Sequence, residues 1–160
     1  MYQKILVPLD GSDLAEGVLP HVKEVARRFE AEVALLQAVP SISQILLETS
    51  ATTMEGTAAT AGLGMDMAEE QHEASKQAAQ SYLDSLAANL KAEGLKVSQH
   101  LVEGAPATAI IEFLHASGAD LIAMSTHGRG GLGRLVFGSV TDEVLRHAAH
   151  TPLLLIRASD

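Results

Sequence analysis

Five short runs rich in Val, Leu and Ile alternate along the chain with longer segments in which apolar residues recur every three or four positions. The runs span residues 4–9, 32–39, 95–102, 120–125 and 152–157. Most are almost continuously apolar, as expected of strands buried on both faces. The run at 95–102 instead alternates polar and apolar residues, which predicts a half-exposed strand at a sheet edge. The whole pattern predicts an α/β fold with a parallel sheet.

Four helices are predicted between these strands. The first has an apolar stripe over 14–29 that faces the core, and Pro20 within the stripe predicts a kink or a late start. The second is expected over about 67–90. The third begins at Pro106, because proline suits the first position of a helix.

The fourth helix is short and begins near Ser139. This serine, followed by Asp142 and Glu143, has the pattern of a capped helix start. Asp13 with Glu16 has a similar pattern and is expected to cap the first helix rather than to bind a metal.

Residues 49–62 fit neither pattern. Of these 14 residues, 12 are Thr, Ala, Gly or Ser, and they carry no apolar period. We expect one domain over 1–160 with a mobile insertion at about 41–66. A loop of this length is usually functional or disordered, so two interpretations stay open: a tolerated surface insertion, or a lid over a site.

Composition excludes several classes of partner. Lys and Arg total 11 against 20 acidic residues, and the net charge of −9 would repel a polyanion such as DNA. Aromatic residues make up only 3%, too few for the stacking that single-stranded nucleic acids require. We therefore expect no nucleic-acid partner.

The cellular location of the protein is predicted from three features that the sequence lacks: cysteine, a signal peptide and a membrane span. There is no cysteine, which excludes a disulfide, a thiolate zinc site and a Cys nucleophile. The apolar run near the N-terminus is too short for a signal peptide, and no stretch approaches the roughly 18–20 apolar residues of a membrane span. We expect a cytoplasmic protein with no membrane contact.

Candidate binding residues follow two of the predicted strands. In open parallel sheets, ligands bind beyond the carboxyl ends of the strands, where the strand order reverses. Asp10 follows the first strand, and a stretch with five glycines, 125–139, follows the fourth. Between 121 and 141 there are two arginines and no acid. Glycines let backbone N–H groups approach a phosphate, and the next helix begins near Ser139, so the pattern predicts an anion site. The alternative is a flexible loop with an ordinary helix cap.

Familiar phosphate-binding motifs do not fit this stretch. A P-loop needs a lysine, and none follows Lys96. The glycines at 128–133 match a dinucleotide fingerprint, but the chain ends before a further strand could supply the ribose-binding acid. A phosphoacceptor receiver domain would use Asp10, yet it also needs an Asp and a Lys where this chain has Glu103 and Arg157.

Histidines near the candidate site do not form a recognisable catalytic or metal centre. His147 and His150 lie three apart near a helix end, but a metal site needs three or four ligands at suitable spacings. His127 precedes the glycine-rich stretch, and no carboxylate follows it to fix its tautomer. We predict no catalytic residue and leave the metal ligands open.

Three segments together match the motifs of one known family. They read Ile-Leu-Val-Pro-Leu-Asp-Gly-Ser at 5–12, Ala-Asp-Leu-Ile-Ala-Met-Ser-Thr-His-Gly-Arg at 119–129, and Thr-Pro-Leu-Leu-Leu-Ile at 151–156. The whole chain resembles the universal stress protein (UspA-like) family. Its nucleotide-binding branch is marked by G-x2-G-x9-G-[ST]; here Gly128, a nine-residue spacer and the pair at 138–139 fit, while Ser125 replaces the first glycine.

This resemblance implies an adenine nucleotide alpha hydrolase-like fold. It consists of an open five-stranded parallel sheet in the order 3-2-1-4-5, with helices on both faces. The resemblance also implies ATP, with Mg²⁺, as the ligand. The residues expected to bind it are Pro8, Leu9, Asp10, Val39, Thr126, His127, Gly128, Arg129, Gly131, Gly138, Ser139 and Val140.

Each part of the ligand has an expected place in that set. The triphosphate is expected on Gly128, Arg129 and the pair at 138–139. Asp10 would take the ribose hydroxyls or the adenine side, and Val39 would lie against the adenine edge through its backbone.

The resemblance further implies a stress-response regulator or sensor that hydrolyses ATP slowly at most. In the implied order the last strand is an edge, so its run Leu153-Leu154-Leu155-Ile156 would expose unpaired backbone. Family members pair this strand across a two-fold axis, and we expect a homodimer here. The alternative function is a nucleotide-free interaction module that acts through dimerisation.

Overall fold

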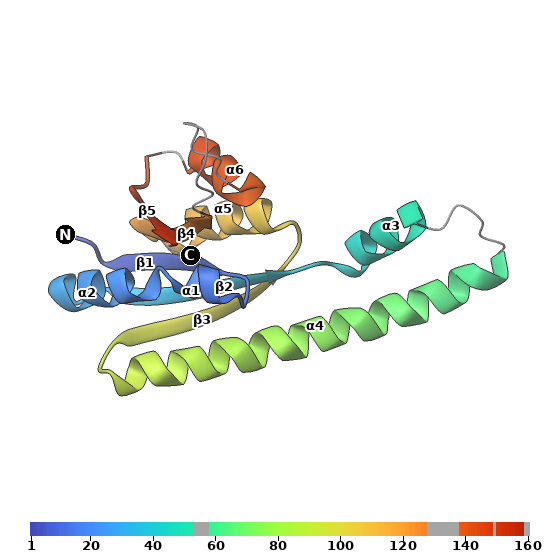
Figure 1. Ribbon diagram of the computed structural model, residues 1–160, viewed down its shortest axis with the longest axis horizontal. Helices are drawn as coiled ribbons and strands as arrows, with labels where there is room; N and C mark the ends of the chain where they lie inside the picture. Colours follow the sequence, from blue (N-terminus) through green and yellow to red (C-terminus); the bar gives the residue numbers. More distant parts are fainter. Residues whose placement is uncertain (53–57, 128–137, 149, 159–160) are drawn as a thin grey trace.

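The computed structural model describes the backbone of residues 1–52, 58–127, 138–148 and 150–158. Its centre is a five-stranded parallel sheet in the order β3-β2-β1-β4-β5 (Figure 1). The strands are β1 (Lys4–Leu9), β2 (Glu32–Val39), β3 (Lys96–Glu103), β4 (Leu121–His127) and β5 (Leu153–Ala158). The fold class and strand order expected from the sequence are confirmed, and β3 lies at an edge as its alternating pattern predicted.

Helices cover both faces of the sheet (Figure 1). One face packs against α2 (Leu19–Phe29) and the second half of α4 (Ala58–Ala92), with the short α1 (Asp13–Glu16) near the strand ends. The other face packs against α5 (Pro106–Ser117) and α6 (Ser139–His147). Two separate apolar cores result, as expected of a sheet buried on both sides.

The central strand β1 contributes to both cores because its side chains alternate between the two faces. Ile5 and Val7 pack with α2 and α4, whereas Leu6 packs with α5 and α6, and all three are fully buried. Each such burial stabilises the fold by roughly 1.5–3 kcal/mol. The position of β1, and therefore of Asp10 directly after it, is fixed from both sides.

Two helix starts differ from the sequence expectation by one residue. The late helix start that Pro20 predicted is confirmed, because α2 begins at Leu19 and has Pro20 in its first turn. At α1, however, Ser12 and not Asp13 is the cap, because its hydroxyl accepts the Ala15 N–H at 3.1 Å. At α6 the cap position is Gly138, which has no side chain to offer, and Ser139 is already helical.

The segment expected as an insertion without regular structure is largely helical. It contains α3 (Ile42–Thr52) and the beginning of α4, while 53–57 lie outside the described residues. The expectation of irregular structure was wrong because it relied on apolar periodicity. The local reasons for a helix are the Ser41 carbonyl, which accepts the backbone N–H of Ile45, and the burial of the Ile45 side chain. Mobility of this segment stays a prediction.

The helix α4 is much longer than the helix predicted over 67–90. It has 35 residues, and its second half is held on the sheet by Leu83, Ala87 and Leu90 at helical spacing. Its first half and α3 extend beyond the sheet as a pair of helices (Figure 1). In the part of the chain that the structure describes, no helix is long and apolar enough to cross a membrane.

Candidate functional site

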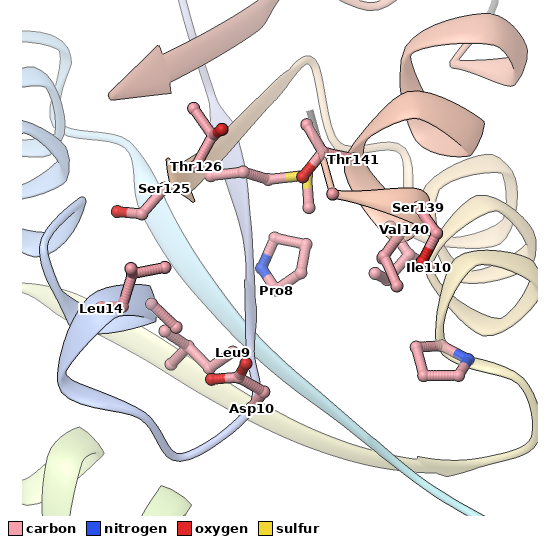
Figure 2. Close-up of a pocket in the computed structure, with 14 residues that line it drawn as sticks. Pro8, Leu9, Asp10, Leu14, Ile110, Ser125, Thr126, Ser139, Val140 and Thr141 are labelled. Atoms are coloured by element: carbon pink, nitrogen blue, oxygen red, sulfur yellow. The ribbon is translucent and has the colours of Figure 1, made fainter. Parts of the chain in front are cut away.

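A cleft of about 300 Å³ opens where the strand order reverses, at the carboxyl ends of β1 and β4 (Figure 2). Its walls also include α1 and the first turns of α5 and α6. The lining residues are Pro8, Leu9, Asp10, Leu14, Ala15, Pro106, Ile110, Met124, Ser125, Thr126, Gly138, Ser139, Val140 and Thr141. This is the place where open α/β sheets bind ligands.

The structure brings together seven of the twelve residues singled out in the sequence. They are Pro8, Leu9, Asp10, Thr126, Gly138, Ser139 and Val140. Val39 is buried at the end of β2 and does not line this cleft, and its carbonyl accepts the Gly104 N–H at 2.9 Å. His127 ends β4. Gly128, Arg129 and Gly131 lie outside the described residues, so the expectations for them stay predictions.

The cleft combines an apolar wall with a polar rim. The wall includes Leu9 from β1, Ile110 from α5 and Met124 from β4, and all three residues are buried. The rim includes Asp10 and Ser139, which lie on either side of Pro8 in the view of Figure 2. An apolar slot with a few polar groups at its margin suits a flat aromatic ring that carries polar substituents.

The carboxylate of Asp10 is held in a fixed orientation. Its Oδ1 accepts hydrogen bonds from the Ser12 backbone N–H at 3.0 Å and from the Ser12 hydroxyl at 2.6 Å. The turn between them requires Gly11 at φ +80°, a region that L-residues rarely adopt. Within the described residues Oδ2 makes no hydrogen bond, so it can accept one from a ligand hydroxyl at the cleft rim.

The N-terminus of α6 faces the same cleft. Gly138 at the cap position provides no side chain, so within the described residues no capping side chain accepts the first backbone N–H groups of the helix. A β-carbon built on Gly138 would meet no described atom within 4 Å. Open space beside an uncapped helix N-terminus favours an anionic group. The acid of the first turn, Asp142, is turned toward Arg146, which it contacts at 2.7 Å.

Several lining residues were not anticipated from the sequence. Pro106 and Ile110 come from the start of α5, a segment that carries no motif. Thr141 is a buried polar residue on the first turn of α6. Its place two residues after Ser139 was a usable signal, because the whole first turn of a helix surrounds its N-terminus.

No metal centre of protein side chains is evident in the described part of the chain. No group of three or more His, Cys, Asp or Glu residues is arranged to hold a metal ion there. Asp10 and Ser139 are polar residues that line the cleft, but they do not make a metal-ligand set by themselves.

The strand order and the position of the cleft define the class of the protein. It is an open parallel α/β protein whose ligand site lies at the reversal between β1 and β4. The sequence profile of the universal stress protein family matches residues 1–157, and the chain belongs to this family.

Two curated relatives come from the archaeon Methanocaldococcus jannaschii. Universal stress protein MJ0531 is 31% identical over 157 residues, which cover 98% of this chain and 83% of the relative. Universal stress protein MJ0577 is 30% identical over 160 residues, which cover 98% of this chain and 96% of the relative. The similarity therefore spans almost the entire sequence.

Solved structures agree with the fold. The structure of MJ0577 superposes with a TM-score of 0.77 at 28% identity and covers 100% of this chain and 99% of its own. A universal stress protein in complex with cAMP gives a TM-score of 0.64 at 22% identity, over 99% and 98% of the two chains. A family protein from Arabidopsis thaliana with AMP bound gives 0.64 at 12% identity, over 98% and 92%. The last two comparisons show a shared fold.

Proposed function

We propose that the protein binds ATP, together with Mg²⁺, in the cleft between β1 and β4. The observation that carries the proposal is the uncapped N-terminus of α6, which faces the same cleft as Asp10 and the apolar wall. An adenine nucleotide has a part that suits each of these three features: an aromatic ring, ribose hydroxyls and phosphates. The ring would pack on the apolar wall, the ribose would donate to Asp10, and the phosphates would accept from the first turn of α6.

Two kinds of similarity support an adenine nucleotide. Proteins of this fold are known in complex with cAMP and with AMP. The chain also carries the spacing from Gly128 to the pair at 138–139 that marks the nucleotide-binding branch of the family it resembles. When bound, Mg²⁺ would neutralise part of the phosphate charge, which matters in a chain with a net charge of −9.

The cellular role that fits this site is that of a stress-response sensor or regulator in the cytoplasm. Among the described residues of the cleft, no nucleophile is paired with a general base and an orienting group. We therefore infer that ATP hydrolysis is slow at most, and that binding itself changes the state of the protein.

A homodimer through β5 is part of the proposal. This strand is an edge of the sheet, and its leucines are half-buried on both faces, so its open side offers both backbone groups and apolar surface. Pairing with a second β5 would satisfy the backbone groups of both edges.

The test is a titration of the full-length protein with ATP, AMP and cAMP, each with and without Mg²⁺, after acid-quench extraction to detect nucleotide that co-purifies. We compare the wild type with Gly138→Asp, which places a carboxylate at the start of α6, and with Gly64→Asp as the same change far from the cleft. We expect micromolar binding of ATP, a loss of about 100-fold in Gly138→Asp from charge repulsion, and no change in Gly64→Asp. Absence of binding at millimolar ATP with Mg²⁺ would favour the nucleotide-free interaction module instead.

A further inference from the structure

The helices α3 and α4 form a hairpin-like arm that extends beyond the sheet (Figure 1). A groove of about 420 Å³ lies between them, far from the cleft between β1 and β4. Its apolar lining includes Ile45, Met67 and Ala74, and Glu70 lies on its margin. The proposed nucleotide site does not use this groove.

The arm exposes large apolar side chains to an unusual degree. Leu47 is 69% exposed, Met67 is 70% exposed and Met65 is 44% exposed. Together they make up half of the large apolar residues that are exposed in the described part of the chain. Flexible Met side chains in particular adapt to the shapes of different partners. Of the three, Met67 lines the groove, and exposed apolar surface at a groove marks an interaction site.

The charge around the groove has one sign. Residues 42–75 include six acids and no Lys or Arg. On α4 the carboxylates of Asp66, Glu69, Glu70 and Glu73 are exposed, and of these four Glu70 lines the groove. The first cation after them is Lys76, and it is engaged with Glu73 at 3.7 Å and Glu103 at 3.2 Å. The groove is therefore apolar inside, with one acid at its margin, and it lies in a segment, 42–75, that carries acids but no Lys or Arg.

We propose that the groove between α3 and α4 binds a basic amphipathic helix of another protein. The apolar face of such a helix would fill the groove at Ile45 and Met67, and its Lys and Arg side chains would pair with Glu70 and be attracted by the other acids of 42–75. A second copy of the arm is a poor occupant, because it would bring its own acids against Glu70 and the other acids of 42–75. The proposal does not depend on nucleotide binding.

Three synthetic 20-residue peptides test the proposal on the full-length protein. The first carries Leu at helical spacing with Lys on the opposite face, the second has the same composition in scrambled order, and the third has the same number of Lys with Ser in place of Leu. Binding is measured by fluorescence anisotropy of labelled peptide. We expect the amphipathic peptide to bind at least about tenfold more tightly than the other two, because only it satisfies both the groove and its margin. Equal affinity for all three peptides would overturn the proposal, because binding would then depend only on the net charge of the peptide.

Matched variants locate the binding on the arm. Glu70→Lys is expected to weaken binding of the amphipathic peptide about tenfold, whereas Glu112→Lys on α5, the same change of charge far from the groove, leaves it unaltered. Met67→Ser is expected to weaken binding severalfold and Met67→Leu to preserve it. All these side chains are exposed, and circular dichroism confirms folding. If Met67→Ser changes the oligomeric state but not peptide binding, a second copy of the chain occupies the groove and the proposal is wrong.

Discussion

The hydroxyl of Ser125 lies 3.3 Å from the point where a β-carbon on Gly17 would stand. Ser125 occupies the position of the first glycine in the nucleotide-binding motif of the family. Strand alternation directs its side chain toward α1, and Figure 2 shows it pointing to the side of Leu14. The missing glycine in the motif is thus accommodated by a glycine on the facing turn, and the hydroxyl stays out of the space beside Pro8.

The pair predicts a measurable coupling between positions 17 and 125. Gly17 has ordinary helical angles, so alanine there gains backbone entropy, but its β-carbon crowds the Ser125 hydroxyl and the Leu14 carbonyl. We expect Gly17→Ala to be more favourable by about 0.5–1 kcal/mol in the Ser125→Gly background than in the wild type. Urea unfolding of the four proteins gives this number, and additivity within about 0.3 kcal/mol would contradict the contact. Because the hydroxyl points away from Pro8, Ser125→Gly should leave nucleotide affinity within about twofold.

A second prediction concerns the attachment of the arm to the sheet. His72 on α4 is buried, and its Nδ1 donates to the Pro40 carbonyl after β2 at 2.9 Å. Its Nε2 lies 3.4 Å from Glu103 at the end of β3. We expect His72→Ala to lower the free energy of unfolding by about 2 kcal/mol, because it removes the packing of a buried side chain and its hydrogen bond to the Pro40 carbonyl.

Lys76 provides the matched control for that prediction. It contacts the same Glu103, but from the surface. Lys76→Ala should lower the free energy of unfolding by less than about 1 kcal/mol, as exposed ion pairs usually do. Equal effects of His72→Ala and Lys76→Ala in thermal unfolding would mean that the hydrogen bond from His72 to Pro40 does not hold the arm.

A third prediction is the loss of stability in acid. The hydrogen bond from Ser98, with a smaller contribution from Lys4, holds the pKa of Glu32 below its ordinary value of 4.5. Burial lowers the pKa of His100 from its ordinary value of 6.5. In both cases the unfolded chain takes up the proton first as the pH falls, so the native state loses stability. The loss begins below pH 6.5 for His100 and below pH 4.5 for Glu32.

One substitution can separate the two pH ranges in which stability is lost. Glu32→Gln removes a titrating carboxylate, so urea midpoints measured against pH should fall less steeply below 4.5 than in the wild type. The decline between 6.5 and 4.5 should persist, because His100 is still buried and has lost an acid that favoured its charged form. Some loss of stability below pH 4.5 will remain in Glu32→Gln, because Lys23 lowers the pKa of Glu93 and Lys76 lowers the pKa of Glu103. An unchanged profile in Glu32→Gln would refute the assignment.

The sequence predicted the sheet because its signal is local. The strand β1 is almost continuously apolar after Lys4, and β4 begins with the apolar run 121–124, so the residues that follow each run are fixed at the carboxyl edge by the strand itself. The strand order was available only through the resemblance to a family, since periodicity does not say which strands are neighbours. Asp10 and Ser139 were found because they directly follow or begin such elements.

The contributions that the sequence did not reveal depend on contacts between distant segments. The helix α3 contains Thr and Ser and lacks a strong apolar stripe, and it is held by packing on α4 rather than by its own pattern. Ile110 reaches the cleft only because α5 crosses the sheet beside α6. Such placements follow from tertiary packing, which a single sequence does not encode in a short motif.

The last prediction tests the proposed pairing of β5 with a second copy. The Ile122 N–H donates to the Pro152 carbonyl at 3.0 Å, so the backbone groups of alternate residues face β4. Those of Leu155 therefore face the open edge. Leu155→Pro removes an edge N–H without removing a donor from the ladder with β4.

Leu155→Ala is the control, because it loses the same side-chain packing but keeps the N–H. We expect Leu155→Pro to shift the protein from dimer to monomer in light scattering over a concentration series, and Leu155→Ala to remain more dimeric than the proline variant. If both variants keep the wild-type mass at every concentration, the dimer does not use the backbone of β5. If the wild type is itself a monomer, the edge is covered in another way, and the backbone pairing proposed for β5 is wrong.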